Sequence, residues 1–179
     1  MNEHVTMTPR HATDKPLSLA VLAMGGQGGG VLADWIVSLA EENGWMAQTT
    51  SVPGVAQRTG ATIYYIEAVP GMEGVHPTLS LMPTPGDVDI VIAAELMEAG
   101  RSVLRGIVTP NQTTLITSTH GSYAVSEKEK PGDGIADPKL VISATDFAAK
   151  RTIAFDMEKI AAKNGSVISA SLFGAFAAS

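Results

Sequence analysis

The sequence predicts an α/β fold built on a mostly parallel sheet with helices on both faces. Short apolar segments alternate along the chain with amphipathic ones, as they do in parallel sheets that are covered by helices. The first apolar run, Leu17–Met24, leads directly into the glycine-rich turn Gly25–Gly30 and then into a helical pattern. With 179 residues, 45% of them hydrophobic, the chain is long enough to bury one core.

The first half of the chain predicts a helix followed by two strands. From Gly28 to Asn43 the apolar residues recur every three or four positions, and Gly44 follows where a left-handed C-cap belongs. Trp45–Thr50 predicts the second strand of the fold. Ala61–Val69 is rich in β-branched and aromatic residues and predicts the third.

The second half predicts further strands and helices. Val88–Ala93 is the clearest strand, and the helix after it carries an apolar stripe with Glu95 at its positive end. The segment Thr113–Thr119 predicts another strand. Weaker strand candidates are Lys139–Ala144 and Arg151–Phe155, a helix capped by Asp156 is expected to run through Lys163, and Val167–Ala178 predicts a buried helix.

The chain divides into a leader and one domain. Residues 1–16 are polar and without periodicity, which predicts a flexible leader, and residues 17–179 form the domain. The sequence stops at Ser179 inside an apolar helical pattern. We therefore expect residues 17–179 to be the N-terminal part of a longer polypeptide.

Composition excludes several classes of function. The net charge of −6 argues against a large nucleic-acid interface, which needs clustered Lys and Arg. The chain contains no cysteine, so it forms no disulfide, thiolate zinc site or ordinary iron–sulfur cluster of its own. The absence of cysteine suits a reducing compartment, and we expect the cytoplasm.

The glycine-rich turn is the first candidate site. A strand, a glycine turn and a helix N-terminus present backbone N–H groups to an anion, usually a phosphate. Gly28, Gly30 and Ala33 match the spacing of a dinucleotide fingerprint, but Met46–Ser51 lacks the acidic residue that would hold a ribose. The alternative is a tight turn whose glycines only permit close packing.

The second candidate site is the segment Gln57-Arg58-Thr59-Gly60. Arg58 is the only Lys or Arg between Lys15 and Arg101. A lone guanidinium after a Pro-Gly turn is suited to a phosphate or a carboxylate, and equally to fixing a loop or contacting a partner chain. Gly60 would let another group approach the backbone closely.

The carboxylates and histidines are weaker candidates. Asp87 and Asp89 flank the start of a predicted strand, and Glu95 and Glu98 open a predicted helix. Paired carboxylates can serve acid–base catalysis, but placement at the positive end of the helix dipole explains the two glutamates, so a structural role is favoured. His120 follows a predicted strand at the edge where ligands bind. A lone histidine there is more often a loop or interface residue than a catalytic one.

Together the two glycine-containing segments carry a family resemblance. Gly25-Gly26-Gln27-Gly28-Gly29-Gly30 and Gln57-Arg58-Thr59-Gly60 resemble the gamma-type domain of 2-oxoacid:acceptor (ferredoxin) oxidoreductases. Within that family the sequence is most similar to the beta subunit of indolepyruvate ferredoxin oxidoreductase. The second segment usually has two glycines after the arginine, and here Thr59 replaces the first of them.

The resemblance implies an enzyme subunit with a Rossmann-like sheet. The whole enzyme would decarboxylate a 2-oxoacid, such as an arylpyruvate or indolepyruvate, to an acyl-CoA and pass the electrons to ferredoxin. Thiamine diphosphate, Mg²⁺ and the iron–sulfur clusters would be held by a larger partner subunit, so this chain would not be active alone. The glycine segment Gly25–Gly30 would lie beside the active site that this chain shares with the partner subunit, together with Gln57 and Arg58. Arg58 is suited there to a phosphate of coenzyme A (CoA), a substrate carboxylate or the partner chain.

Two other functions remain open at this stage. The glycine turn is compatible with a free-standing dinucleotide-binding module for NAD(P) or FAD. It is also compatible with a non-catalytic structural subunit, whose glycines serve packing against a partner chain.

Overall fold

The computed structural model describes residues 15–52, 61–74, 76–121 and 138–179. Its strands form one six-stranded sheet in the order β2-β3-β1-β4-β5-β6. The strands are β1 (Leu17–Ala23), β2 (Trp45–Val52), β3 (Thr62–Pro70), β4 (Ile90–Ala93), β5 (Thr114–Ser118) and β6 (Arg151–Phe155). The helices are α1 (Gly29–Glu42), α2 (Leu96–Leu104), α4 (Pro138–Ala148), α5 (Met157–Lys163) and α6 (Ile168–Ala177).

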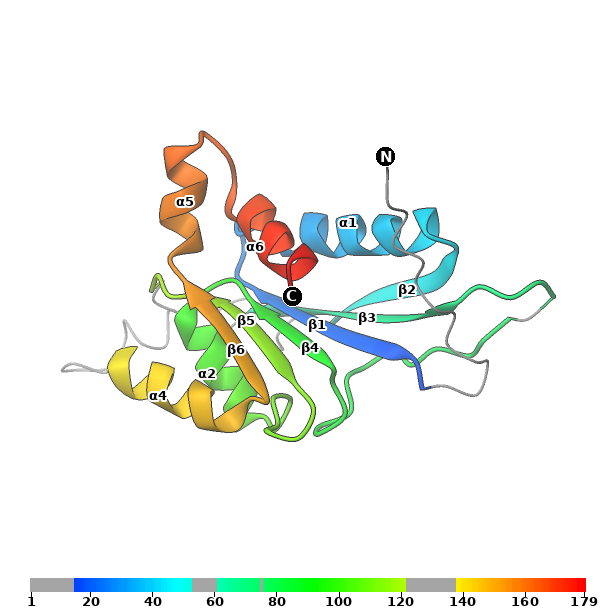
Figure 1. Cartoon of the computed structure of the whole chain (residues 1–179), viewed down its shortest axis with the longest axis horizontal. Helices are drawn as coiled ribbons and strands as arrows, with labels where there is room; N and C mark the ends of the chain where they lie inside the picture. The colour runs from blue at the N-terminus through cyan, green and yellow to red at the C-terminus, as the bar shows by residue number, and fades with distance from the viewer. Residues whose placement is uncertain (1–14, 53–60, 75, 122–137) are drawn as a thin grey trace, which may run out of the picture.

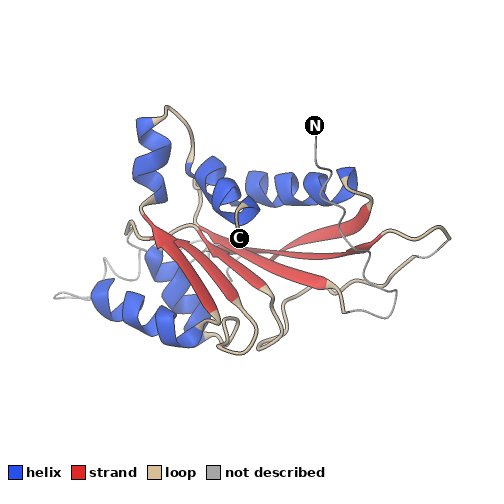
Figure 2. Cartoon of the chain, viewed as in Figure 1, coloured by secondary structure: helices blue, strands red, loops and turns tan. Residues whose placement is uncertain are grey.

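The sheet is mostly parallel, as the sequence predicts. Strands β1, β4, β5 and β6 pair in parallel, whereas β3 is antiparallel to both of its neighbours, β1 and β2. Strands β2 and β3 follow each other in the chain and pair antiparallel, and β3 lies between β1 and β2 in the sheet (Figure 2).

Helices cover both faces of the sheet, and a separate apolar cluster lies under each layer. Helices α1, α5 and α6 lie over one face, and α2 and α4 lie over the other (Figure 1). The alternation of β1 divides its side chains between the two clusters. Leu19 and Val21 pack under α1 and α6, while Ala20 and Leu22 join the cluster on the side of α2.

The prediction of a strand at Lys139–Ala144 is wrong, because this segment lies in helix α4. Pro138 occupies the first helical position, where its fixed φ and missing N–H are tolerated. Val141 and Ile142 favour a strand by their branching, but Val141 packs closely on Gly100 of α2. Packing between α4 and α2 therefore outweighs local propensity.

Most helix ends lie where the sequence predicts them. Gly44 adopts a φ of 77° directly after α1, and Gly106 a φ of 68° after α2. Asp156 caps α5 by accepting a hydrogen bond from the Lys159 N–H. Glu95 caps α2 in the same way, accepting from the Glu98 N–H at 3.1 Å.

A buried polar network fastens the connector before β4 to the sheet. The Tyr65 hydroxyl donates to Glu67 Oε1 at 2.5 Å, and the Ser80 N–H donates to Glu67 Oε2 at 2.6 Å. The Thr50 hydroxyl also donates to the carbonyl of Leu81. Glu67 therefore joins β3 to a segment that has no regular secondary structure of its own.

This network predicts a loss of stability at high pH. Burial raises the pKa of Tyr65 well above its ordinary value of 10.0, and the hydrogen bond to the Glu67 carboxylate raises it further. The folded chain thus holds this proton more tightly than the unfolded chain, so the stabilisation is complete below about pH 10 and is lost above it.

We expect Tyr65→Phe to cost about 1–2 kcal/mol at neutral pH, because it removes one buried hydrogen bond. We also expect the variant to lose less stability than the wild type between about pH 9 and pH 11, since it has no such proton to release. Urea unfolding at each pH measures both effects. Parallel pH curves for the two proteins would contradict the assignment.

Candidate functional site

The glycine turn lies at the point where the chain connections change sides of the sheet. Helix α1 follows β1 and covers one face, whereas α2 follows the neighbouring strand β4 and covers the other. Ligands of open α/β sheets bind in the crevice at such a point, at the carboxyl ends of the strands. The residues after β1, β4 and β5 all lie at this edge.

Hydrogen bonds within the turn hold its shape. The Gln27 N–H donates to the Met24 carbonyl at 3.1 Å, and the Gln27 side chain accepts from the Met24 N–H at 2.8 Å. Gly26 and Gly28 adopt φ angles of 88° and 70°, a left-handed backbone conformation that residues with a side chain rarely adopt. Gln27 thus closes the turn with its own side chain.

The glycines of this turn meet two different demands. A Cβ atom on Gly29 would lie 2.6 Å from the Ala23 Cβ and 2.7 Å from the Tyr64 ring, so the first turn of α1 packs directly on the sheet. Gly30 lies against the same tyrosine ring. A Cβ on Gly25 or Gly26 would meet no described atom within 4 Å. Close packing explains Gly29, but it does not explain Gly25.

The start of α1 leaves backbone donors at this edge. The first bond of the helix runs from the Leu32 N–H to the Gly28 carbonyl at 2.9 Å. The N–H groups of Gly29, Gly30 and Val31 therefore have no acceptor within the helix. Gly28 is the N-cap and supplies no side chain to bind them. The helix dipole adds partial positive charge at this end, which favours an anion.

Two cavities flank the turn. The larger, of about 630 Å³, lies between Gly25–Gly28 and residues of α5, α6 and the end of β5, among them His120, Glu158 and Ser169. The smaller, of about 390 Å³, lies on the other side and reaches Thr62 and Tyr64 at the start of β3. Lys and Arg are missing from the described linings of both cavities, so the backbone N–H groups at the start of α1 are the donors available there to an anion.

His120 is held in place beside the larger cavity. Its Nδ1 lies 2.7 Å from Ser118 Oγ, and that oxygen accepts the Met157 N–H at 3.0 Å. The His120 carbonyl also accepts the N–H of Leu96, the first residue of α2. The histidine and the glycine turn, which are 90 or more residues apart in sequence, therefore line one cavity.

The other candidates fall into two groups. Gln57, Arg58, Thr59 and Gly60 lie outside the described residues. The four carboxylates have structural partners: Glu98 pairs with Arg101, Glu95 caps α2, and Asp87 and Asp89 pair with Lys15. The hydrogen bond from the Lys15 ammonium lowers the pKa of Asp87.

Sequence reasoning missed Ser118, Ser169 and Tyr64. Ser118 carries a usable signal, because it is a polar residue at the carboxyl end of a buried strand, two positions before a histidine. Ser169 lies 3.0 Å from the position a Cβ on Gly28 would take, and only the folded chain brings α6 there. In the sequence Tyr64 is indistinguishable from any other strand residue, and only the folded chain packs Gly29 and Gly30 on its ring.

A family model decides the relationship. The model described as "pyruvate ferredoxin/flavodoxin oxidoreductase" matches residues 18–179. The chain belongs to this family. The match begins in β1 and includes every described helix and strand after it, so the glycine turn and both cavities lie within the family domain. No curated protein matches the chain.

Solved structures share the fold of this family domain. A pyruvate oxidoreductase subunit from Thermotoga maritima is 18% identical with a TM-score of 0.59, over 91% of this chain and 75% of that one. The gamma subunit of a keto/oxoacid ferredoxin oxidoreductase from Geobacter sulfurreducens is 13% identical with a TM-score of 0.52, over 87% and 70%.

A third structure is a much longer chain. It is a 2-oxoglutarate:ferredoxin oxidoreductase from Magnetococcus marinus, with 2-oxoglutarate, CoA and succinyl-CoA bound. It is 15% identical with a TM-score of 0.55, and the match covers 89% of this chain but 23% of that one. The family domain described here thus corresponds to about a quarter of that polypeptide.

The described residues of the family domain hold no grouping of three or more His, Cys, Asp or Glu side chains suited to a metal ion. Among the helices of these residues, none is long and apolar enough to cross a membrane.

Two glycine substitutions separate packing from ligand binding. We expect Gly29→Ala to destabilise the fold by about 1–3 kcal/mol, because its methyl group overlaps Ala23 and Tyr64. Gly25→Ala, with open space around it, is expected to change stability by less than about 0.5 kcal/mol. Thermal or urea unfolding measures both variants. Equal effects would show that the two glycines do not differ in this way.

The Ser118 contact predicts the tautomer of His120. We expect the Ser118 hydroxyl to donate to Nδ1, so that the neutral ring carries its proton on Nε2. Correlation of ring protons with nitrogen-15 distinguishes the tautomers by NMR. Ser118→Ala should release this preference and cost about 1–3 kcal/mol, because the Met157 N–H loses its acceptor. A wild-type ring protonated on Nδ1 would contradict the prediction.

Proposed function

We propose that this chain is a subunit, or one domain of a subunit, of a CoA-dependent 2-oxoacid oxidoreductase. The whole enzyme would decarboxylate a 2-oxoacid to an acyl-CoA and transfer the electrons to ferredoxin. The family match over residues 18–179 is the observation that carries this proposal. The Magnetococcus marinus structure supports it, since that 2-oxoglutarate:ferredoxin oxidoreductase shares the fold and has CoA bound.

The glycine turn is proposed to bind phosphate groups of CoA. The N–H groups at the start of α1 have no helical acceptor, and the space around Gly25 and Gly26 is open. Both features suit an anion, so the residues present fit the group. CoA, when bound, supplies the thiol that takes up the acyl group. In this chain Gly25, Gly26, Gln27, Gly28, Gly29 and Gly30 would position its phosphates.

The segment Gln57-Arg58-Thr59-Gly60 is proposed to complete the site. β2 ends at Val52 and β3 begins at Thr62, opposite the end of β1, where Ala23 pairs with Thr62. The connection between these strands therefore begins and ends at the same edge as the glycine turn. Arg58 would contribute the cation that the described linings of the two cavities lack.

Thiamine diphosphate, Mg²⁺ and the iron–sulfur clusters are proposed to belong to a larger partner subunit. The chain has no cysteine to ligate a cluster, and its described residues contain no grouping of three or more His, Asp or Glu side chains suited to a metal ion. Thiamine diphosphate, when bound in that subunit, would supply the nucleophile for a 2-oxoacid carbonyl. This chain would border that centre and bind the acyl acceptor, and it would be inactive alone.

The substrate class and the compartment are further parts of the proposal. The resemblance of the two glycine-containing segments to the indolepyruvate enzymes points to an arylpyruvate. The absence of cysteine suits the cytoplasm. These two points rest on sequence, and a substrate screen of the assembled enzyme with pyruvate, 2-oxoglutarate and indolepyruvate tests the first.

The strand order argues against a dinucleotide-binding module. In the dinucleotide fold the second strand lies next to the first, and its end holds the ribose. Here β3 separates β2 from β1, so the end of β2 does not border the glycine turn directly. A purely structural subunit accounts for Gly29, but it gives no role to the open space beside Gly25 and Gly26.

Ligand titration of the assembled enzyme tests the CoA site. At about 100 times its dissociation constant, CoA should raise the unfolding free energy by about 2.7 kcal/mol, whereas NADH and FAD should not. Arg58→Ala should weaken CoA binding about ten- to a hundredfold if the guanidinium contacts a phosphate. Unchanged CoA affinity and turnover would remove Arg58 from the site, and stabilisation by NADH alone would overturn the proposal.

A further inference from the structure

Helix α1 exposes an apolar stripe to solvent. Val31, Trp35 and Leu39 are spaced four residues apart and so lie along one side of the helix, and their exposed fractions are 48%, 38% and 38%. The Trp35 ring is also in edge contact with Phe173 of α6, with ring centroids 5.8 Å apart. Large apolar side chains at regular helical spacing on a surface are typical of a helix–helix interface.

The C-terminal end of α1 carries negative side chains, which are unfavourable beside the negative end of the helix dipole. Glu41 and Glu42 are exposed in its last turn, where the helix dipole is negative and basic residues are favoured. No base lies in that turn, and none of the ion pairs among the described residues involves either glutamate. Their placement costs stability within this chain, which is typical of a site that serves another molecule.

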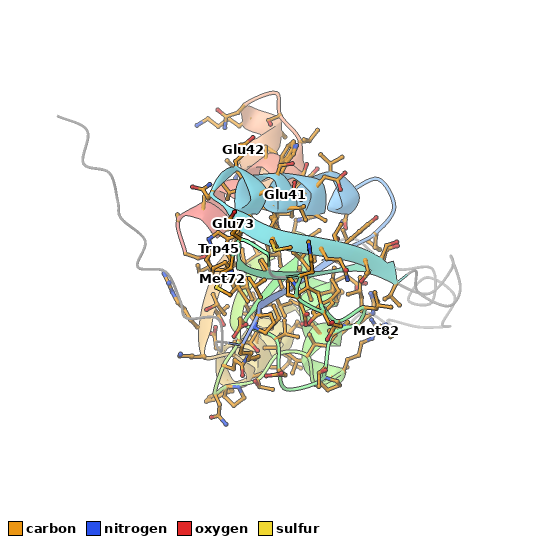
Figure 3. The ribbon with its side chains drawn as sticks, turned by 90° about the vertical axis from the view of Figure 1, so that its right-hand side faces the viewer. Glu41, Glu42, Trp45, Met72, Glu73 and Met82 are labelled. Carbon is orange, nitrogen blue, oxygen red and sulfur yellow. The ribbon has the colours of Figure 1, made fainter. Side chains whose placement is uncertain are left out.

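A third carboxylate joins this corner through a close backbone contact. The Gly71 N–H donates to the Gly44 carbonyl at 2.9 Å, and a Cβ on Gly71 would lie 2.6 Å from that oxygen. This contact brings the turn after β3 to the end of α1. Figure 3 shows Glu41, Glu42, Trp45, Met72 and Glu73 gathered there.

An apolar cavity opens beside the acidic corner. It has a volume of about 270 Å³, and Asn43 is the only polar residue in its described lining. Leu39 and Trp45 both line the cavity, and Leu39 is exposed whereas Trp45 is half-buried. The cavity suits a large apolar side chain that would enter between α1 and the sheet.

We propose that this α1 surface, formed by Val31, Trp35, Leu39, Glu41, Glu42, Trp45, Met72 and Glu73, docks an amphipathic helix of another protein with an apolar stripe flanked by Lys and Arg. The stripe would pack on Trp35 and Leu39, and its basic flank would neutralise Glu41, Glu42 and Glu73. The helix start at Gly29 lies at the opposite end of α1, about 20 Å away for 14 residues. The acidic end of the docking surface is therefore separate from the glycine turn, whereas Val31 at its other end also lines both cavities beside that turn.

Charge decides against a second copy of this chain as the occupant. Residues 16–57 contain no Lys or Arg, and α1 itself carries three acidic residues and no basic one. Two copies of this surface facing each other would bring like charges together, which disfavours association. A basic partner meets the apolar and the acidic features at once.

The two tryptophans of the chain, Trp35 and Trp45, both belong to this surface, so intrinsic fluorescence reports its occupation directly. The probe is a helical peptide of about five turns with leucines at helical spacing and lysines beside them. We expect it to shift the fluorescence of the full-length chain, with binding that weakens between about 0.05 M and 0.5 M salt. A peptide with glutamate in place of every lysine should not bind.

Charge reversal supplies the decisive variant. Glu41→Lys/Glu42→Lys should weaken binding of the lysine peptide by at least about tenfold, while its own thermal stability is kept or raised, since lysine suits this helix end. The control, Asp146→Lys on α4 at the other face of the sheet, should bind within about twofold of the wild type.

Several results would overturn the proposal. The first is equal binding of the lysine and glutamate peptides to the wild type. The second is unchanged binding of the lysine peptide by Glu41→Lys/Glu42→Lys, and the third is a loss of lysine-peptide binding in Asp146→Lys as large as in that double variant. A peptide-free dimer in sedimentation would assign the surface to a second copy, and binding that appears only after deletion of residues 1–14 would assign it to the chain's own first segment. None of these measurements uses CoA, so the proposed function stands or fails separately.

Discussion

The close contact between the start of α1 and the sheet determines where everything else in the site lies. Gly29 packs so tightly on Ala23 and Tyr64 that a single added carbon would overlap both. Without a side chain at this position, the helix begins directly above the end of β1. Its first N–H groups, which have no acceptor within the helix, then lie at the edge where β1 and β4 end, and ligands of open α/β sheets bind at such an edge.

The same contact explains why the turn needs so many glycines. Gly29 and Gly30 allow the helix to approach Tyr64, Gly26 and Gly28 supply left-handed backbone, and Gly25 leaves space open. Gln27 is the one side chain in the run, and it closes the turn on Met24. Different glycines of the turn therefore meet different structural requirements, and only the open space at Gly25 and Gly26 is suited to a ligand.

Local pattern was sufficient for most of the fold and insufficient for the site. Helix α1 and the cap at Gly44 follow from periodicity and backbone conformation, which are properties of neighbouring residues. The segment Lys139–Ala144 is helical although its local pattern predicts a strand, because the helix is stabilised by packing on Gly100, which is about 40 residues away in sequence. His120 and Ser169 reach the glycine turn only through the order of β1, β4 and β5, which no local pattern determines.

The two ends of helix α1 carry opposite partial charges, and each end favours a binding partner of the opposite charge. Its N-terminus offers unpaired donors and partial positive charge, whereas its C-terminus adds Glu41 and Glu42 to the negative end of the dipole. A ligand anion at one end and a basic partner at the other would each relieve an unfavourable term of the same helix. Because β1 and the helix start are packed closely around Gly29, the sheet itself fixes the position of the donors at the glycine turn.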